Sequence, residues 1–317
     1  MTGTPQFSVI INNYNYGRFL PTAVSSALSQ MGVPAEVIVV DDGSTDNSRQ
    51  VIQALGPRIR PHLQQNRGQA AAINAGVALA CAPILVFLDA DDWFLPGKLR
   101  ALHDAFAAHP QAGLIYHRLR PVRDDGQPAF APIPRTLCQG DLGPRLLRSG
   151  GRWPFPMTSS LAVRRSLWDA AGNIPETFAI SADAWLTGIL PFLAPVVALP
   201  DALACYRIHD NTWHRDNDDA AMLARRMAHW EKTVEVTNAV LADRGLPGRI
   251  RLADHFAYQV AAARLGRAGA PGAGRLLRLG LTDRGEPNPL RRLRDTLGAL
   301  AAVRRDSAGA GRRAPAA

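Results

Sequence analysis

The chain has 317 residues, 47% of them hydrophobic, which is enough for one large α/β domain or two smaller ones and excludes a wholly disordered protein. Its three widely spaced cysteines exclude a full disulfide framework and favour a reduced, cytoplasmic setting, and the first residues lack the pattern of a secretory signal peptide. The net charge of +9 rests almost entirely on arginine, which favours phosphate-bearing partners or an anionic membrane surface, or else reflects a GC-rich genome. No nucleic-acid-binding motif accompanies that charge, so we expect no nucleic-acid partner.

The first half of the chain alternates short apolar, β-branched runs with segments of helical periodicity. We predict strands at residues 7–11, 36–40, 58–64 and 84–88. We predict helices at residues 20–31, 44–55 and 69–80, the second of them capped by Ser44, Thr45 and Asp46. Strands that alternate with helices in this way form right-handed crossovers. The predicted fold class is therefore α/β, with a mostly parallel, Rossmann-like, doubly wound sheet flanked by helices.

Polar side chains follow three of these strands directly. The first strand ends in Asn12-Asn13-Tyr14-Asn15, the second in Asp41-Asp42-Gly43-Ser44 and the fourth in Asp89-Ala90-Asp91-Asp92. In doubly wound sheets, ligands bind outside the carboxyl ends of the strands. We therefore predict a binding site where these three segments converge.

The acidic cluster after the fourth strand predicts a divalent cation, Mn²⁺ or Mg²⁺. Neighbouring carboxylates repel one another unless a cation or hydrogen-bond donors neutralise them. Mg²⁺ is typically held by one or two carboxylates together with substrate phosphates, and it stabilises the charge left on a departing diphosphate. The alternative is a solvated acidic turn that caps the next helix.

The acidic pair after the second strand follows the same logic. Asp41 and Asp42 can accept hydrogen bonds from a nucleobase N–H or a ribose hydroxyl, and Gly43 permits a tight turn. The alternative is an ordinary strand-to-helix turn with an aspartate cap.

The second half of the chain is less regular. We predict a loop or irregular hairpin at 121–134, a strand at 158–163, and helices at 166–171, 221–241 and 251–265. The apolar stretch 185–199 is short and is interrupted by Pro191 and Pro195. We interpret it as buried core, with a re-entrant or interfacial segment as the alternative.

Three runs of the chain carry a family resemblance: SVIINNYNYGRFLPTAVSSALSQ, EVIVVDDGSTDNS and NRGQAAAINAGVALACAPILVFLDADDWFLPGKL. In motif, order and spacing they resemble the inverting family 2 glycosyltransferases with the GT-A fold. The resemblance is close over residues 7–100 and weaker to about residue 214. It implies a GT-A domain at 1–214, with a nucleotide-binding part at 1–118 and an acceptor part at 119–214. We expect a helical C-terminal extension at 215–306 and a disordered basic tail at 307–317.

The resemblance also implies roles for individual residues. The nucleoside is implied to bind Asn12, Tyr14, Asp41 and Asp42. The ribose and the metal-bound diphosphate are implied to bind Asp89 and Asp91. The donor pocket is implied to be lined by Asn66, Arg67, Gly68 and Asn74.

A catalytic base is implied further along the chain. Family members carry an acidic pair, usually Glu-Asp, before an aromatic helix, and the matching segment here is Ile180-Ser181-Ala182-Asp183-Ala184-Trp185-Leu186. Asp183 is therefore the implied base, and Ala182 replaces the usual Glu. A carboxylate near the acceptor hydroxyl, opposite the leaving diphosphate, inverts the anomeric centre. The alternative is that Asp183 only caps a helix.

Two other segments resemble parts of the family site. Tyr206-Arg207-Ile208-His209 matches a segment that reaches the diphosphate, so His209 is a candidate metal or diphosphate ligand, with a purely structural histidine as the alternative. The segment 153–158 lies where acceptor loops sit in similar proteins. Trp153 could stack there on a sugar ring or pack in the core.

These features predict an inverting, non-processive, hexosyltransferase-like enzyme. It would move a single sugar from a nucleoside-diphosphate sugar, a UDP-sugar first, to a glycan or lipid-linked acceptor in cell-surface polysaccharide or lipopolysaccharide biosynthesis. A nucleotidyltransferase is the nearest alternative, but Asn-Asn-Tyr-Asn replaces the Gly-rich phosphate loop expected of one. A non-catalytic nucleotide-sugar binding module is the second, because of Ala182. The absence of GxGxxG after the first strand argues against a dehydrogenase.

The basic C-terminal region bears on location. We expect a cytoplasmic protein, and the Arg-rich helices from Leu290 onward are a candidate for peripheral contact with the inner face of the cell membrane.

Overall fold

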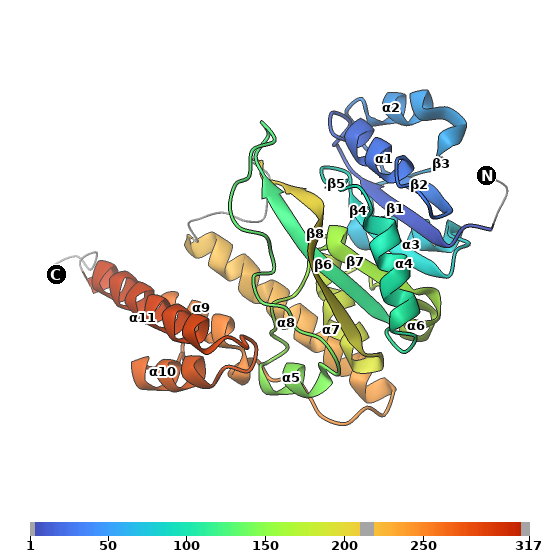
Figure 1. The fold of residues 1–317 in the computed structure, drawn as a ribbon. Helices are drawn as coiled ribbons and strands as arrows, with labels where there is room; N and C mark the ends of the chain where they lie inside the picture. The colour runs from blue at the N-terminus through green and yellow to red at the C-terminus, as the bar shows by residue number, and fades with distance from the viewer. Residues whose placement is uncertain (1–3, 210–218, 312–317) are drawn as a thin grey trace. The chain divides into compact units, whose positions relative to one another are not determined.

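The computed structural model describes residues 4–209 and 219–311, which form two compact units (Figure 1). The first unit comprises residues 4–141 and 155–209, and the second comprises residues 142–154 and 219–311. The acceptor part expected from the sequence, 119–214, included 142–154. The segment belongs to the second unit because Arg145 donates to the backbone carbonyl of Arg284 and Arg152 pairs with the buried Asp283. The predicted boundary at residue 214 lies outside the described residues.

An eight-stranded sheet forms the frame of the first unit, in the order β3-β2-β1-β4-β7-β6-β8-β5. Its parallel part consists of β1 (Phe7–Asn13), β2 (Ala35–Asp42), β3 (Arg60–Gln64) and β4 (Ile84–Asp89). The remaining strands are β5 (Trp93–Phe94), β6 (Leu114–Val122), β7 (Leu161–Arg164) and β8 (Val196–Arg207). β7 is antiparallel to β4 and β6, β6 is parallel to β8, and β5 is antiparallel to β8. The predicted mostly parallel sheet is confirmed; the strand predicted at 158–163 is the antiparallel β7, whereas β5, β6 and β8 were not predicted.

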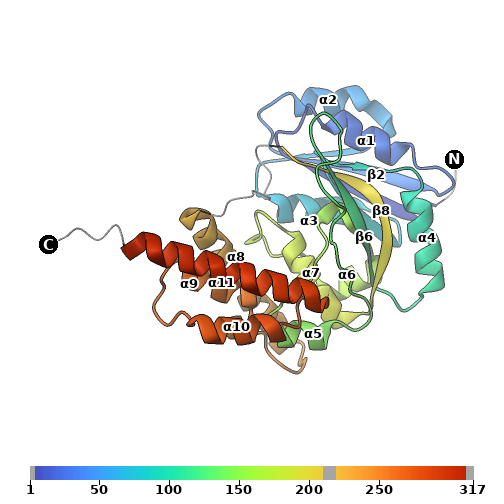
Figure 2. The same ribbon diagram turned by 60° about the vertical axis from the view of Figure 1, so that its left-hand side comes forward.

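Helices cover both faces of this sheet (Figures 1 and 2). They are α1 (Leu20–Leu28), α2 (Ser48–Leu55), α3 (Gln69–Leu79), α4 (Lys98–Ala108), α6 (Arg165–Ala171) and α7 (Asp183–Leu193). On one face Val9 of β1 shares a buried cluster with Val24 of α1 and Leu102 of α4. On the other face Ile38 and Ala72 pack β2 against α3. Because parallel strands are buried on both faces, their sequences read as nearly continuous apolar runs.

Some predicted elements, such as those at 44–55 and 158–163, start later in the structure than the sequence pattern predicted. α2 begins at Ser48, because Thr45 and Asp46 donate their backbone N–H groups to Asn15 Oδ1 in a turn. The strand predicted at 158–163 begins at Leu161, after a 3₁₀ turn over Thr158–Ser160.

The first part of the apolar stretch 185–199 is buried core: residues 185–191 are buried, whereas beyond them Val196 is buried, Pro195 is exposed and the others are half-buried. Trp185 and Leu186 of α7 are at most 2% exposed, and the ring of Trp185 lies 6.3 Å from that of Trp168 in α6. Across residues 4–209 and 219–311, no helix combines the length and apolar character that a membrane crossing requires.

The second unit is helical. It contains α5 (Gly143–Arg148), α8 (Ala220–Asp243), α9 (Phe256–Arg264), α10 (Ala273–Thr282) and α11 (Pro289–Gly311). Its core includes Leu223 and Met227 of α8 packed with Ala261 and Ala262 of α9. α11 continues into the segment 307–317 for which we predicted a disordered tail, and residues 312–317 lie outside the described residues.

Candidate active site

Strand ends that the sequence marks as polar meet at the carboxyl edge of the parallel strands. In register, Asn12 of β1 lies opposite Val40 of β2 on one side and Asp89 of β4 on the other. Asn12 Nδ2 donates to Asp89 Oδ1 at 2.9 Å, and Asn13 Nδ2 donates to Asp41 Oδ1 at 2.8 Å. The three segments therefore converge, as the rule for doubly wound sheets requires.

Asp89 lies in a crowded acidic environment. Burial is the main cause that raises its pKa to about 7, and the charges of Asp91 and Asp183 act in the same direction. Hydrogen bonds from Asn12 and Gln69 oppose that shift. The raised pKa means that the negative charge of this carboxylate is costly here, and a bound proton or a bound cation offsets that cost.

Asp92 points into the protein and is only 2% exposed. Its Oδ1 accepts the backbone N–H of Arg207 at 2.9 Å, which ties the acidic turn to the end of β8. Burial and the charges of Asp91 and Asp89 raise the pKa of Asp92 well above its usual range. The turn is therefore not a solvated acidic cap, and Asp92 serves its architecture.

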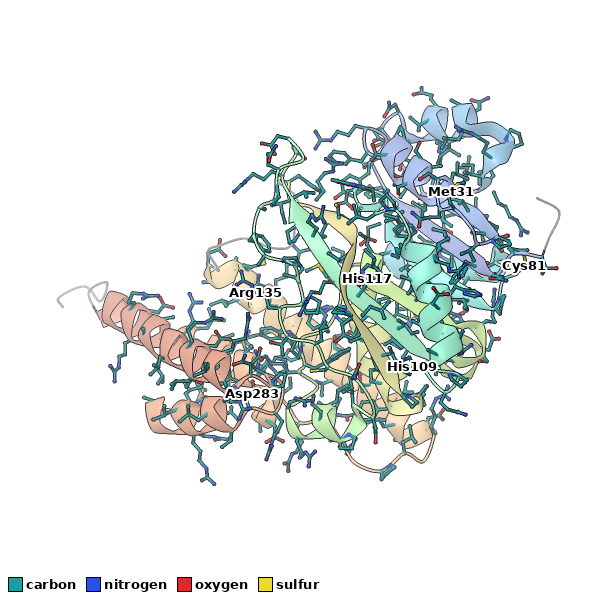
Figure 3. The ribbon with its side chains drawn as sticks, in the orientation of Figure 1. Met31, Cys81, His109, His117, Arg135 and Asp283 are labelled. Carbon is teal, nitrogen blue, oxygen red and sulfur yellow. The ribbon has the colours of Figure 1, made fainter. Side chains whose placement is uncertain are left out.

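A buried lysine supports the turn from behind. Lys98 is fully buried, its Nζ donates to the backbone carbonyl of Ser159 at 2.8 Å, and it lies 3.6 Å from the centroid of the Phe94 ring. Burial lowers the pKa of Lys98 well below its usual range, while the charge of Asp92 opposes that effect. His117 on β6 (Figure 3) is buried as well, and both burial and Lys98 lower its pKa. Neither Lys98 nor His117 was predicted from the sequence to support the site.

Two residues at the end of β8 and just after it, Arg207 and His209, contact Asp91. His209 Nε2 lies 2.9 Å from Asp91 Oδ2, and the imidazole packs against the rings of Tyr16 and Phe19 with centroid distances of 5.5 and 5.6 Å. Arg207 Nε donates to the backbone carbonyl of Asp91 at 3.0 Å, and its guanidinium lies 4.4 Å from the Phe19 ring centroid. His209 thus reaches the acidic turn, and Arg207 holds the turn through the backbone.

Asp183 is the first residue of α7, and Ala182 is the N-cap without a capping side-chain hydrogen bond. Burial raises the pKa of Asp183 to about 6, against hydrogen bonds from the backbone at Ala184 and Thr158. Because its charge also raises the pKa of Asp89, the two carboxylates share one electrostatic environment. A carboxylate with a pKa near 6 is ionised at neutral pH and more basic than an ordinary aspartate, as a general base should be.

Gln69 connects Asp89 to the segment that carries Asp183. Its Nε2 donates to Asp89 Oδ1 at 2.9 Å, and its Oε1 accepts the backbone N–H of Ala182 at 3.0 Å. Its backbone N–H donates to Ala179 O at 2.8 Å. Gln69 was not among the predicted site residues, although its position between Gly68 and Asn74, inside the donor motif, marks it as a candidate.

Other residues of the donor motif hold the same segment. The side-chain amide of Asn74 makes two hydrogen bonds with the backbone of Ile174, at 2.8 and 3.0 Å. Arg67 pairs with Glu176, and its side chain is 59% exposed. Asn74 is thus engaged with the loop before α7, whereas the guanidinium of Arg67 remains at the surface.

Asp42 organises the start of the donor motif. Its two oxygens accept from Gln64 Nε2 at 2.7 Å and from the backbone N–H groups of Arg67 and Gly68 at 2.9 and 2.7 Å. A carboxylate offers about four acceptor positions, so one remains for a further donor. Gly43, at φ +76°, allows the chain to pass close by, because a Cβ there would lie 2.6 Å from the backbone nitrogen of Asn66.

Asp41 is fully buried and differs from Asp42 in its partners. It accepts from Asn13 Nδ2 and from the backbone N–H of Ser44 at 3.2 Å, and Arg49 Nε lies 3.5 Å away. These contacts stabilise the turn after β2.

The edge of β1 keeps unused acceptors. Asn12 Oδ1 and Asn13 Oδ1 are buried and lack a hydrogen-bond partner among the described residues. Buried polar atoms without a partner are rare, so each one calls for an explanation, such as a bound ligand or water. The next residue, Tyr14, is 46% exposed and has its ring free to stack.

Comparison with known proteins identifies this arrangement. A family model described as glycosyl transferase family 2 matches residues 8–171. The chain belongs to this family. It is a glycosyltransferase, and the family expectation drawn from the three sequence runs is confirmed.

Related glycosyltransferases support the assignment. The chain is 36% identical over 261 residues to an uncharacterized glycosyltransferase of Nostoc sp., covering 80% of this chain and 81% of the relative. It is 34% identical over 162 residues to the succinoglycan biosynthesis protein ExoU of Rhizobium meliloti, covering 45% of each chain. It is 35% identical over 125 residues to a chondroitin synthase of Pasteurella multocida, covering 38% of this chain and 13% of that much longer one.

Solved glycosyltransferases share the fold. Residues 1–349 of S. aureus TarS, in complex with UDP-GlcNAc, superimpose with a TM-score of 0.55 at 18% identity, covering 97% of this chain and 92% of that TarS fragment. The mannosyltransferase PcManGT of Pyrobaculum calidifontis, in complex with GDP-Man and Mn²⁺, gives a TM-score of 0.55 at 18% identity, covering 99% of this chain and 77% of that one. The GT-A fold class is thereby confirmed.

The side chains of this glycosyltransferase fit a cation that a diphosphate helps to hold. Among residues 4–209 and 219–311, no three or more His, Cys, Asp or Glu side chains are arranged as a ready-made metal cage. Asp91 and His209 nevertheless meet at 2.9 Å beside Asp89. Mg²⁺ and Mn²⁺ sites in phosphate-transfer enzymes commonly use one or two carboxylates and take further oxygens from substrate and water. The donor set suits that kind of site.

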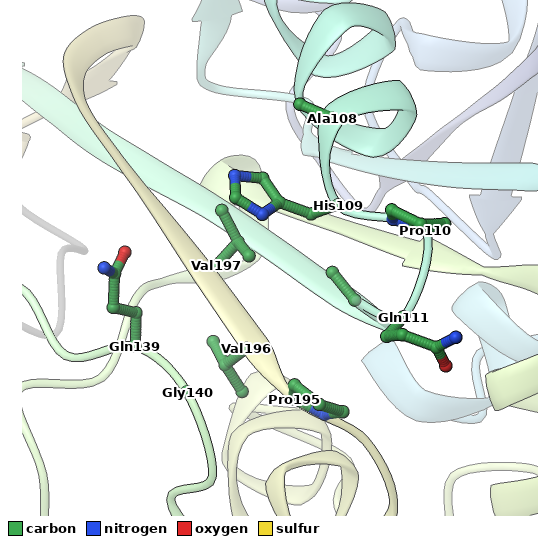
Figure 4. Close-up of a pocket in the computed structure, with 10 residues that line it drawn as sticks. Ala108, His109, Pro110, Gln111, Gln139, Gly140, Pro195, Val196 and Val197 are labelled. Carbon is green, nitrogen blue, oxygen red and sulfur yellow. The ribbon is translucent and has the colours of Figure 1, made fainter.

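The glycosyltransferase has a separate hollow of about 530 Å³ (Figure 4). It lies at the amino ends of β6 and β8, where His109, Gln139 and Val196 line it. This is the opposite edge of the sheet from the carboxylates, because β6 runs parallel to β4 through the antiparallel β7. The hollow is therefore distinct from the candidate active site.

Proposed function

We propose that this glycosyltransferase moves a single sugar, with inversion, from a nucleoside-diphosphate sugar to the hydroxyl group of a glycan or lipid-linked acceptor. The donor would lie along the carboxyl ends of β1, β2 and β4. Asp183 would accept the proton of the attacking hydroxyl.

The nucleoside is proposed to bind near Asn12, Tyr14 and Asp42. The partnerless Asn12 Oδ1 suits a ribose hydroxyl or a nucleobase N–H, and Asp42 has one acceptor position left. The exposed ring of Tyr14 suits stacking on a base. Asp41 would act through the turn after β2, since its oxygens already serve that turn.

The diphosphate is proposed to lie at Asp89, Asp91 and His209 with a divalent cation, Mn²⁺ or Mg²⁺. Such a cation, when bound, neutralises the charge that develops on the leaving diphosphate. The raised pKa of Asp89 supports this placement, because a cation would compensate the negative charge of that carboxylate and so lower the free energy of the site. Arg67 is exposed and can supply a further positive charge to the donor.

The chemical step uses the raised pKa of Asp183. The acceptor oxygen attacks the anomeric carbon, the bond to the diphosphate oxygen breaks, and the hydroxyl proton passes to Asp183. Its pKa of about 6 favours this transfer over that to an ordinary aspartate. Ala182 is fully buried and donates its backbone N–H to Gln69, so the neighbour of the base has a defined structural place despite the departure from Glu.

The observation that carries the proposal is the link between the two acidic centres. Gln69 hydrogen-bonds Asp89 on the donor side and Ala182 on the side of the base. A role as a helix cap alone would not require Asp183 to lie close enough to the acidic turn after β4 to raise the pKa of Asp89.

Relatives guide the choice of donor and acceptor. TarS binds UDP-GlcNAc and PcManGT binds GDP-Man with Mn²⁺, so UDP-sugars come first and GDP-sugars second. The names of ExoU and of chondroitin synthase favour an acceptor in cell-surface polysaccharide or lipopolysaccharide biosynthesis. We place the reaction in the cytoplasm, at the inner face of the cell membrane.

The test combines donor binding with transfer for one variant. Asp183→Asn is expected to lower transfer, or hydrolysis of the donor, by about a hundredfold or more, while UDP-sugar with Mn²⁺ still raises the melting temperature. Asp169→Asn, at an exposed aspartate of α6, is the matched control and should transfer normally. Transfer by Asp183→Asn near the wild-type rate would remove Asp183 from the proposal.

The same assay separates the alternatives. Stabilisation by nucleotide sugars without any turnover, across UDP- and GDP-donors, would favour a non-catalytic binding module. Stabilisation by nucleoside triphosphates but by no nucleotide sugar would favour a nucleotidyltransferase.

A further inference from the structure

Helices α10 and α11 of the second unit pack closely along one side. Thr296 of α11 is fully buried, and a Cβ on Gly280 of α10 would lie 2.3 Å from its hydroxyl oxygen. Arg292 NH1 donates to the backbone carbonyl of Leu281 at 3.1 Å, which joins the two helices again. The sides of α10 and α11 that face each other are therefore fixed by these contacts.

Exposed positions of both helices carry leucines at helical spacing. In α11, Leu290, Leu293 and Leu297 are 77, 44 and 54% exposed. In α10, Leu277 and Leu281 are 38 and 42% exposed. Single exposed leucines are common, but several on adjoining helices form an apolar patch of the kind that marks an interaction site. We call these five residues the leucine face.

The segment that carries the leucine face is rich in arginine, and its acidic residues are either buried or paired with arginine. Residues 273–306 contain eight arginines and four acidic residues. Of the four, Asp283 and Glu286 are buried, Asp295 pairs with Arg294, and Asp306 pairs with Arg264. Exposed arginines of the two helices are Arg275, Arg278, Arg294, Arg304 and Arg305. The face is therefore both apolar and positively charged.

This combination selects one kind of partner. A second copy of the chain would set arginines against arginines as it covered the leucines, which costs electrostatic energy. An anionic bilayer complements both features, because leucines enter the boundary between headgroups and acyl chains while arginines bind lipid phosphates. We propose that the leucine face of α10 and α11 lies on the surface of an anionic lipid bilayer.

The proposal gives the arginine-rich region a definite contact surface. α11 is amphipathic in an unusual sense, since its inner side carries the polar Thr296 while leucines face outward. The membrane proposal rests on the proposed function at one point, the lipid-linked acceptor, because an enzyme bound to the bilayer and an acceptor anchored in it are confined to the same surface. It does not depend on the donor or on Asp183.

Co-sedimentation of the full chain with vesicles tests the proposal. The protein is expected to bind vesicles that contain phosphatidylglycerol and to bind pure phosphatidylcholine vesicles at least about tenfold more weakly, with binding that falls as salt is added. The variant Leu290→Gln/Leu293→Gln/Leu297→Gln should lose about tenfold or more in affinity for the anionic vesicles. The variant Arg294→Gln/Arg304→Gln/Arg305→Gln should lose about as much and show a weaker salt dependence.

Controls make the outcome decisive. Met31→Gln/Leu63→Gln alters two apolar side chains of the first unit, Met31 (Figure 3) and Leu63, which are 82 and 51% exposed. This variant should bind vesicles like the wild type. All altered positions are exposed, so circular dichroism should confirm an unchanged fold. Equal binding of the leucine variant and the wild type would overturn the proposal. So would a concentration-dependent dimer in sedimentation velocity that the leucine substitutions abolish. Transfer measured in detergent-free solution on a water-soluble acceptor stays independent of either result.

Discussion

Gln69 donates to Asp89 across 2.9 Å, and this amide joins the donor side of the glycosyltransferase site to the proposed base. The other end of the same side chain accepts the backbone N–H of Ala182, directly before Asp183. A single side chain thus sets the position of one carboxylate relative to another that lies far away in the sequence. Four properties of this site and of the loop that supports it can be measured.

Replacing Gln69 with glutamate tests this bridge. Gln69→Glu keeps an acceptor for Ala182 but replaces the donor to Asp89 with a second carboxylate, which repels it. We expect transfer to fall about tenfold to a hundredfold, as for residues that orient a metal ligand, with most of the loss in kcat. Steady-state kinetics checks this. Gln53→Glu, on the exposed side of α2, is the control, and wild-type kinetics in Gln69→Glu would refute the bridging role.

Gly68 tests the packing of the loop before α7. A Cβ there would lie 2.6 Å from Ala179 Cα, and the backbone has φ +89°. Gly68→Ala should therefore lower the free energy of unfolding by about 3 kcal/mol and displace the segment that carries Asp183. Gly32 has φ +79° but no atom within 4 Å of such a Cβ, so Gly32→Ala should cost only about 1 kcal/mol. Urea denaturation compares the two, and equal costs would mean that the close approach does not matter.

The pH dependence of transfer tests the base. Asp183 must be ionised to accept a proton, and burial raises its pKa to about 6. We therefore expect kcat to fall about tenfold per pH unit below about pH 6, with donor and Mn²⁺ saturating. Asp183→Glu, if active, should shift this limb. A rate that stays constant down to about pH 4.5 would contradict an Asp183 base with that pKa.

The pH dependence of stability has the opposite sign. Because the folded state raises the pKa of Asp183, it binds the proton more tightly than the unfolded chain does. This contribution is present in full below the unfolded pKa of 3.8 and is lost as pH rises through about 6. Burial lowers the pKa of His117 and His255, which act in the opposite direction, so the useful quantity is a difference between proteins.

The comparison uses Asp183→Asn, which cannot titrate. Relative to that variant, the wild type without metal should gain roughly 2–3 kcal/mol of unfolding free energy between about pH 7 and about pH 4. Urea denaturation at several pH values measures the difference. A difference that grows toward high pH instead would show that Asp183 is stabilised in its ionised form.

Local pattern predicted much of the fold and part of the site. β1, β2 and β4 are buried on both faces, so their apolar runs ended where polar residues began, and Asn12 and Asp89 could be placed from that boundary alone. The antiparallel β7 was harder to place, because a four-residue strand after a 3₁₀ turn leaves little periodicity. The attachment of 142–154 to the second unit depends on contacts with Asp283 and Arg284, which no local pattern carries.

Side-chain partners were the least predictable feature. Asp41 and Asp42 are adjacent in sequence, yet Asp41 is used by its own turn and Asp42 by the backbone of the donor motif. Asn74 matched a donor-pocket motif but bonds to Ile174, which lies 100 residues further on. Pairings over such separations follow from the tertiary fold, and a linear motif cannot distinguish a residue that touches a ligand from one that holds a loop.

The two reciprocal bonds between Asn74 and Ile174 have a consequence for engineering. Together with the hydrogen bond from Ala182 to Gln69, they fix the position of the loop before α7 relative to α3. A chimera that exchanged only the amino-terminal motifs between two family members would cut across these bonds. A chimera should therefore acquire the donor preference of the other family member only when the loop from Ile174 to Asp183 is exchanged together with helix α3.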